Sequence, residues 1–228
     1  MRLFELAGRD DLRFSPHCWR ARLALAHKGL EAETVPVRFT EKQAIAHSGQ
    51  GMLPVLEDGE RVIADSWAIA SYLEDAYPER PSLFGSAEGH GLARFVNQWS
   101  AATLQPAIIR CIIKDVYDHV DPMDQGYFRE SREARFGKSL EEIQAGREQH
   151  AAALVAALLP LRATLKAQPW LSGPAPRYAD YIVFGAFQWA RCVSDFAFLG
   201  PEDPVLDWRD RVAELFDGLG NSVVSAAN

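Results

Sequence analysis

The chain has 228 residues, which is enough for one large domain or two small ones. Its hydrophobic content of 48% and charged content of 24% are ordinary for a globular protein and exclude a low-complexity or fibrous chain. The net charge of −7 and the pI near 5.4 argue against a surface for nucleic acid or anionic membrane, so we expect neither partner.

Targeting signals and metal-binding patterns are absent from the sequence. No basic region followed by an apolar run starts the chain, and no stretch reaches membrane-spanning length without charges, so we expect no signal peptide. Three widely spaced cysteines, Cys18, Cys111 and Cys192, fit a reduced cytoplasm better than a disulfide framework. Neither they nor the six histidines have metal-ligand spacing, so we expect a cytoplasmic protein without a metal.

The first elements are a short apolar strand over residues 3–7, a turn, and a helix that begins after Ser15. Pro16 suits the first helical position, and Gly29 is a plausible C-terminal cap. The free N–H groups and the dipole of a helix start favour negative charge, so Ser15 stands where an anion, including a thiolate, would be stabilised. The alternative is that Ser15 only caps the helix.

Alternating strands and helices continue to about residue 77. The predicted elements are a strand at 33–37 with Pro36 indicating an edge, a short helix at 40–47, strands at 52–57 and 61–64, and a helix that starts at Asp65-Ser66 and ends near Tyr77. The order β-α-β-α-β-β-α predicts a small mixed sheet with helices on its faces.

The rest of the chain is predicted to be helical. After the Pro78–Pro81 break we expect a long helix over 92–112 bent near Pro106, an irregular connection over 121–136, a long helix over 141–166 kinked at Pro160, a buried helix over 178–193, a short helix over 206–215, and a fraying tail after Gly220.

Four motifs in chain order resemble those of the cytosolic glutathione transferases. They are Ser15-Pro16-His17-Cys18, Leu53-Pro54-Val55-Leu56, Asp65-Ser66, and Tyr178-Ala179-Asp180. The resemblance implies a thioredoxin-like domain over 1–78, a linker over 79–88 and an all-helical domain over 89–228. The position three before Asp180 is Arg177 rather than Ser or Thr, so the capping box of that helix is incomplete.

The resemblance also implies where glutathione binds as co-substrate. Ser15 would donate its hydroxyl to the glutathione sulfur as the catalytic residue. A cis bond at Leu53-Pro54 would turn the Leu53 backbone toward the cysteinyl amide of glutathione. Asp65 and Ser66 would bind the γ-glutamyl end, although a plain helix cap and a trans proline are the alternatives. Lys42, or else Arg38, would bind the glycine carboxylate.

Within the family, the stretch from Ser15 to Gly29 looks most like the bacterial β-etherase-type enzymes, which cleave aryl ethers. Trp19-Arg20 also resembles the zeta-class isomerases. Serine at position 15 excludes the thiol–disulfide exchange of omega-type enzymes by that residue. Cys18 is either the remnant of a glutaredoxin-like arrangement or simply buried.

We therefore expect a glutathione transferase that attacks a hydrophobic small-molecule electrophile, with aryl-ether cleavage as one form. A zeta-type isomerase, a non-catalytic glutathione- or ligand-binding protein, and an interaction module that kept the fold remain open. The candidates for the apolar floor of the site are Trp99, Ile109, Ile113, Tyr117 and Tyr127. The resemblance, together with an apolar stretch at Leu92, Phe95 and Val96, implies a homodimer.

Overall fold

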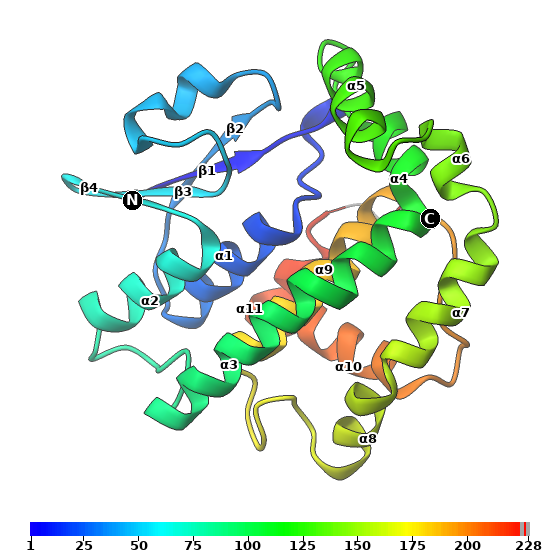
Figure 1. Ribbon diagram of the computed structural model, residues 1–228. Helices are drawn as coiled ribbons and strands as arrows, with labels where there is room; N and C mark the ends of the chain where they lie inside the picture. Colours follow the sequence, from blue (N-terminus) through cyan, green and yellow to red (C-terminus); the bar gives the residue numbers. More distant parts are fainter. Residues whose placement is uncertain (224–225, 227–228) are drawn as a thin grey trace.

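In the computed structural model, which describes residues 1–223 and residue 226, a four-stranded sheet lies beside a larger group of helices (Figure 1). The strands are β1 (Arg2–Leu6), β2 (Glu33–Val37), β3 (Val55–Asp58) and β4 (Arg61–Ala64). Their order is β2-β1-β3-β4, with β1 and β2 parallel and the other two pairs antiparallel. Strand β2, which contains Pro36, is at an edge of the sheet as predicted. Proline has no backbone N–H, so in a central strand it would leave a hydrogen bond of the sheet unmade.

The helical elements of this first domain are η1 (Arg9–Asp11), α1 (Pro16–His27), η2 (Lys42–Ser48) and α2 (Ser66–Ala76). The predicted thioredoxin-like order is confirmed, with a 3₁₀ helix in place of the short helix expected at 40–47. Strand β3 begins three residues later than expected. Both backbone groups of Met52 are bonded to the Gln50 side chain instead of a neighbouring strand.

The start of α1 is held by bonds that reach back to β1. The Trp19 indole donates to the Arg13 carbonyl at 2.8 Å, and the Leu6 N–H donates to the Cys18 sulfur at 3.4 Å. Trp19 and Cys18 are both buried, so this helix face is part of the core. At the other end Gly29 has φ +62°, which confirms it as the left-handed residue that ends the helix.

The second domain is all-helical, as predicted. Its elements are α3 (Ala87–Trp99), the π-helical η3 (Ser100–Leu104), α4 (Gln105–His119), α5 (Gln125–Phe136), α6 (Leu140–Gln144), α7 (Arg147–Ala157), α8 (Leu159–Ala167), α9 (Tyr178–Val193), α10 (Pro204–Ala213), α11 (Leu215–Gly218) and η4 (Leu219–Asn221). The predicted long helix continues through this region as α3, η3 and α4, and the widened turns of η3 end two residues before Pro106.

Two predictions in this half are wrong. The segment 121–136 is not irregular: α5 occupies Gln125–Phe136 and ends at Gly137, whose φ is +69°. The segment 141–166 is not one helix but three. Gly146, at φ +71°, separates the first two. The kink expected at Pro160 is present, because α7 and α8 are bent by 46° and Pro160 lies in the first turn of α8. The predicted fraying tail lies partly outside the described residues.

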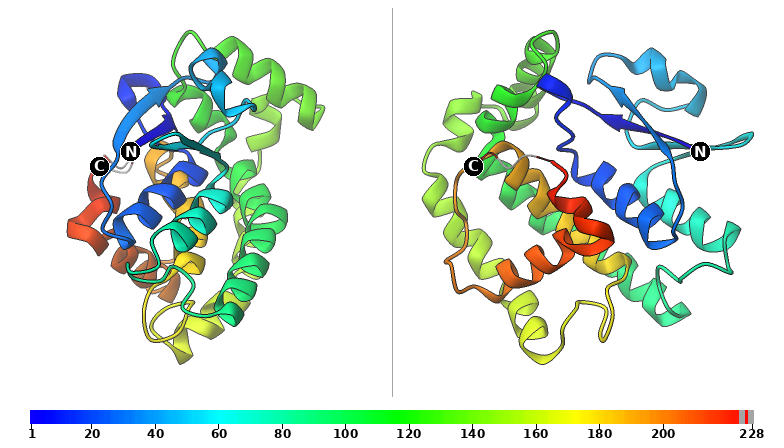
Figure 2. Two further views of the ribbon diagram at one scale, coloured as in Figure 1. Left: turned by 90° about the vertical axis from the view of Figure 1, so that its left-hand side faces the viewer. Right: turned by 180° about the vertical axis from the view of Figure 1, so that it is seen from behind.

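Helix α9 packs against α1 and joins the two domains (Figures 1 and 2). A Cβ on Gly185 would lie 2.4 Å from the Pro16 carbonyl oxygen, so only glycine allows this approach. The Trp19 and Phe184 rings meet edge-on at 6.5 Å. The Tyr178 hydroxyl donates to the Ser66 carbonyl at 2.6 Å. The position of the α1 N-terminus is therefore set from both domains.

The cap of α9 depends on Asp180, which is fully buried. Its carboxylate accepts from the backbone N–H of Arg177 at 3.1 Å, from that of Leu171 at 2.8 Å, and from the Trp208 indole at 2.9 Å. An arginine side chain offers donors and no acceptor, so this cap rests on the aspartate. Although position 177 is not Ser or Thr, the Asp180 carboxylate supplies the hydrogen bonds that hold the start of α9.

In the part of the chain that the structure describes, no single helix is long and apolar enough to span a membrane. Helices α7 and α8 reach the length and apolar composition of a membrane span only when taken together, and they are bent relative to each other by 46°. The same residues contain no group of three or more His, Cys, Asp or Glu that could hold a metal ion.

Candidate functional site

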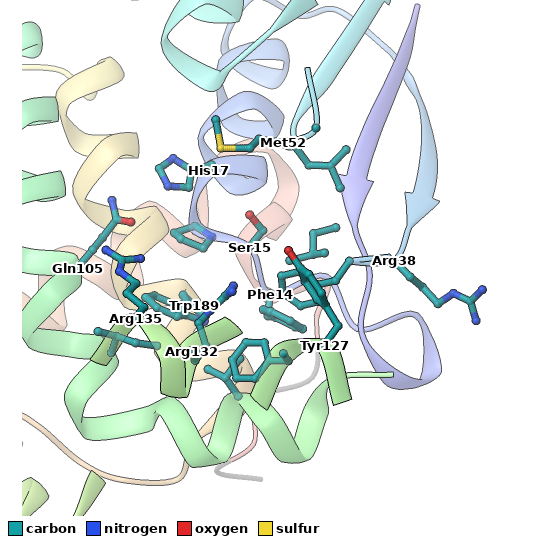
Figure 3. A pocket seen from close by; sticks show the side chains of 18 of the residues that line it. Phe14, Ser15, His17, Arg38, Met52, Gln105, Tyr127, Arg132, Arg135 and Trp189 are labelled. Carbon is teal, nitrogen blue, oxygen red and sulfur yellow. The ribbon is translucent and has the colours of Figure 1, made fainter. Parts of the chain in front are cut away.

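A cavity of about 490 Å³ opens between the N-terminus of α1, the η2 segment, and helices α4 and α5 (Figure 3). Ser15, Lys42 and Leu53 line it from the first domain. Helices α4, α5 and α9 close the other side, so the cavity lies where the two domains meet.

Ser15 caps α1 and faces this cavity. Its Oγ accepts the Cys18 N–H at 3.4 Å, and the residue is only 5% exposed. The cap uses an acceptor position of the oxygen, and the hydroxyl also lies within hydrogen-bonding reach of the buried Cys18 sulfur. The capping interpretation is thus confirmed as structure. Because the cap uses only an acceptor position, the O–H can rotate from the Cys18 sulfur toward a group bound in the cavity.

Neither neighbour of Ser15 in the first turn supplies a charge at neutral pH. Burial, and then the nearby Arg20 guanidinium, lower the pKa of His17 to about 4. Burial raises the pKa of the Cys18 thiol to about 12. Cys18 is therefore a buried, protonated residue of the core. A thiolate bound here would depend on the Ser15 hydroxyl and the helix dipole.

The Leu53-Pro54 peptide bond is cis, as the sequence motif predicts. Leu53 lines the cavity, and within the described chain neither its N–H nor its C=O has a hydrogen-bond partner. Both groups are free for an extended peptide ligand. Pro54 lies behind this wall, and its carbonyl accepts the Asp65 N–H at 3.2 Å.

Asp65 and Ser66 begin α2 beside this wall without lining the cavity itself. Asp65 has φ +82°, a region that non-glycine residues rarely adopt, and such strain gathers at functional sites. One oxygen of its carboxylate accepts from Trp67 N at 2.8 Å and Ala68 N at 3.2 Å, while the residue as a whole is exposed. Ser66 is buried, at 2% exposure.

The two candidate cations for a terminal carboxylate differ in their partners. Arg38 pairs with Glu41 at 2.6 Å and lies 3.7 Å from Asp121, and it extends away from Ser15 in Figure 3. Lys42 has its Nζ 5.4 Å from the centre of the Tyr127 ring, and no carboxylate in the described residues pairs with it. The geometry favours Lys42 as the cation open to a ligand.

Of the five side chains expected at the apolar floor, Ile109 and Tyr127 line the cavity. Trp99, Ile113 and Tyr117 do not, and Ile113 is fully buried in the core. Sequence reasoning missed the polar and charged residues on this side, which are Gln105, Arg110, Arg132, Arg135 and Trp189. The available signal was the spacing of Phe128, Arg132 and Arg135, which places them on one helix face.

Asp124 holds α5 over the cavity. Its buried carboxylate accepts from Phe39 N at 2.7 Å, Thr40 N at 3.2 Å and Thr40 Oγ at 2.5 Å, and so joins the start of α5 to the first domain. The Phe39 and Phe128 rings then meet edge-on at 5.6 Å. Charge-assisted bonds of this kind are stronger than neutral ones, so α5 is a fixed wall of the site.

Comparison with known proteins agrees with this geometry. Residues 11–81 match the N-terminal domain of glutathione S-transferases, and residues 91–198 match their C-terminal domain. The chain belongs to the glutathione S-transferase family. Glutathione is the co-substrate of this family, and the two matched regions contain Ser15, the cis proline and the walls of the cavity.

Among relatives, a zeta-class glutathione S-transferase of Euphorbia esula is 32% identical over 109 residues, which are 46% of this chain and 48% of that protein. The maleylacetoacetate isomerase of Mus musculus is 31% identical over 107 residues, or 43% and 49% of the two chains. The match thus spans about half the length of each relative.

Solved glutathione transferases share the whole fold. GSTFuA3 from Phanerochaete chrysosporium superposes with a TM-score of 0.84 at 26% identity, covering 93% of this chain and 96% of that one. CsGST63524 from Ceriporiopsis subvermispora, solved in complex with glutathione, has a TM-score of 0.80 at 23% identity and covers 99% of both chains.

Proposed function

We propose that this protein binds glutathione between the N-terminus of α1 and the Leu53–Asp65 edge, and that it transfers the glutathione sulfur to an electrophile. The observation that carries the proposal is the Ser15 hydroxyl, which lines the cavity at the N-terminus of α1 and caps this helix only as an acceptor. Free backbone groups at Leu53 and the unpaired Lys42 suit the amide and the glycine carboxylate of the tripeptide. The N-terminus of α2, with Asp65, suits the γ-glutamyl end.

In this mechanism Ser15 donates to the glutathione sulfur, and the dipole of α1 adds favourable potential. Both effects stabilise the thiolate over the thiol and lower the thiol pKa, so more nucleophile is present at neutral pH. The thiolate then attacks the electrophilic carbon, a carbon–sulfur bond forms, and the leaving group departs with the bonding pair. In aryl-ether cleavage, the finer reaction that the sequence resemblance favours, that leaving group is a phenolate.

A second candidate is glutathione-dependent cis–trans isomerisation. It is favoured by the similarity to the zeta-class protein and to the maleylacetoacetate isomerases. In this reaction the sulfur adds to a double bond and leaves again after rotation, so the same thiolate stabilisation serves both reactions.

The test begins with glutathione binding by calorimetry, with S-hexylglutathione as competitor. Absence of heat and of competition would refute the proposal. Turnover of chlorodinitrobenzene, of a β-aryl ether and of maleylacetoacetate then separates conjugation, ether cleavage and isomerisation. Binding with none of these activities would support a glutathione-binding protein without turnover instead.

Lys42 and Arg38 provide an internal comparison for the glycine carboxylate. We expect Lys42→Met to weaken glutathione binding about tenfold, because one charge-assisted bond is lost. Arg38→Met, which removes a cation already paired with Glu41, is expected to change binding less than about twofold. The reverse order would assign the role to Arg38.

We also propose a two-fold homodimer through α3. Leu92 is 52% and Phe95 is 69% exposed on this helix, and a dimer interface would bury them. Sedimentation equilibrium is expected to give twice the chain mass of 25.4 kDa. A mass of one chain throughout the micromolar range would rule the dimer out.

A further inference from the structure

The wall of the cavity is cationic although the protein is acidic. The chain carries a net charge of −7, yet the residues that line the cavity, within the described part of the chain, include five cations and no Asp or Glu. The five are Arg38, Lys42, Arg110, Arg132 and Arg135. Chance placement in a chain with more carboxylates than cations would give the opposite sign. Arg38 is neutralised by Glu41, and Lys42 is assigned above to glutathione.

Arg110, Arg132 and Arg135 are the cations that the proposed function leaves unused inside the site, and the last two belong to α5. These two lie on one face of α5, three residues apart, and both face the cavity in Figure 3, on the far side of Ser15 from Met52. Glutathione is proposed to lie along the Leu53 edge, next to Met52. The two arginines are therefore on the side where an electrophile would approach the sulfur.

Arg132 is a half-buried cation without an acidic partner. In the described residues its guanidinium donates to Ser131 Oγ at 2.9 Å and stacks 4.7 Å from the Phe128 ring centre, and no carboxylate pairs with it. Burial lowers the pKa of this guanidinium from the ordinary value, although the neighbouring Tyr127 side chain acts in the opposite direction. A partly buried guanidinium without a carboxylate partner can bind an anionic group of a ligand.

Two neutral N–H donors add to the excess of hydrogen-bond donors over acceptors on the cavity wall. Gln105 Nε2 and Trp189 Nε1 are buried, belong to residues that line the cavity, and have no hydrogen-bond partner among the described residues. Unpaired buried donors are uncommon in native proteins. On this side the wall offers N–H groups in excess of acceptors, next to the apolar surface of Phe14, Ile109 and Phe136.

We propose that the second substrate is a hydrophobic electrophile that carries a carboxylate, and that Arg132 and Arg135 bind this carboxylate. This proposal rests on the proposed function, since it assigns the substrate class of the same site. The planar guanidinium forms paired bonds to a carboxylate, and the aromatic and aliphatic wall covers the rest of the molecule. The two arginines then orient the reactive carbon toward the sulfur held at Ser15.

The experiment compares two substrates that differ in charge alone. A chlorodinitrobenzoate and the matching chlorodinitrobenzamide both react with glutathione by one displacement. The carbon–sulfur bond forms, the carbon–chlorine bond breaks, chloride leaves with the bonding pair, and the thiol proton goes to solvent. Each kcat/KM is divided by the uncatalysed rate with glutathione, which removes the difference in intrinsic reactivity. We expect the wild type to prefer the benzoate about tenfold or more.

Arg132→Met and Arg135→Met are expected to lower this preference, about tenfold for the more buried Arg132 and less for the exposed Arg135. Turnover of the benzamide and the Kd of glutathione are expected to stay within about twofold. The matched control is Arg129→Met, on the same helix but outside the cavity, where the arginine pairs with Glu133 and Glu141. It is expected to leave the preference unchanged.

Two measurements on the wild type do not depend on variants that fold. Its preference for the benzoate is expected to fall as ionic strength rises from about 0.05 to about 0.5 M. The benzoate is also expected to bind more tightly than the benzamide without glutathione, measured by quenching of tryptophan fluorescence.

Equal affinities and equal turnover of the two compounds, with normal glutathione binding, would overturn this inference and leave the proposed function standing. Loss of glutathione binding in Arg132→Met would assign the arginine to glutathione, and no glutathione binding in the wild type would refute the proposed function itself.

Discussion

Replacing Ser15 by alanine tests the reaction and the fold of the site together. Ser15 Oγ accepts Cys18 N at 3.4 Å, and its O–H can turn from the nearby Cys18 sulfur to donate to a ligand. Its backbone, at φ −61° and ψ 124°, suits alanine equally well. The substitution therefore removes a weak cap and one donor to the sulfur, and leaves the cavity wall otherwise intact.

The two losses differ in size. The capping bond is long, so its loss is expected to lower the free energy of unfolding by about 0.5–1 kcal/mol. A hydrogen bond to a charged sulfur contributes about 1.5–3 kcal/mol, so kcat is expected to fall about ten- to a hundred-fold. The pKa of bound glutathione rises by about one to two pH units for the same reason.

The assay follows thiolate absorbance against pH in the glutathione complex and kcat with chlorodinitrobenzene at each pH. Ser15→Thr keeps the hydroxyl and is expected to retain most of the activity. Ser86→Ala is the matched control, since it removes an N-cap from α3, where Ser86 Oγ accepts Gly89 N at 3.1 Å far from the cavity. If Ser15→Ala keeps full turnover and an unchanged thiol pKa, the hydroxyl is only a cap and the helix N–H groups activate the thiol.

Three further outcomes follow from the contacts around the site. Asp124→Asn loses charge-assisted bonds between the domains and is expected to lower the free energy of unfolding by about 2–4 kcal/mol, with faster hydrogen exchange in α5 than in α9. Gly185→Ala places a Cβ 2.4 Å from the Pro16 carbonyl and is expected to destabilise by about 1–3 kcal/mol, whereas Gly126→Ala in open space on α5 is neutral or stabilising; equal melting temperatures for the two would contradict the close approach of α9 and α1. The pKa of His17 is lower in the folded than in the unfolded chain, so the unfolded chain takes up the proton first as pH falls. The free energy of unfolding is therefore expected to fall by about 2 kcal/mol between about pH 7 and pH 5, and to level off below about pH 4. A denaturation series in which His17→Gln shows the same loss over this range would refute the assignment to His17.

The sequence by itself determined the elements whose signals are local. A serine before a proline predicts the start of α1, and Gly29 predicts its end, because caps depend on a few neighbouring residues. The same holds for the edge strand at Pro36. The four motifs in order then carried the resemblance to the family, and with it the cis bond at Leu53-Pro54.

The helical domain showed the limits of local patterns. Residues 121–136 contain a proline, a glycine and many polar side chains, which favour an irregular segment when they are considered alone. The start of helix α5 is held by the Asp124 carboxylate, which bonds to Phe39 and Thr40, 85 and 84 positions away. Such a contact has no signature in the sequence near either partner, so the tertiary structure decides it.

The tertiary structure also decided the chemistry of individual side chains. Burial keeps the Cys18 thiol protonated, and the pairing of Arg38 with Glu41 distinguishes this arginine from Lys42. Arg132 and Arg135 became site residues once α5 was placed over the cavity. Charge, burial and pairing depend on what the folded chain brings within a few ångströms, and those neighbours come from segments far apart in sequence.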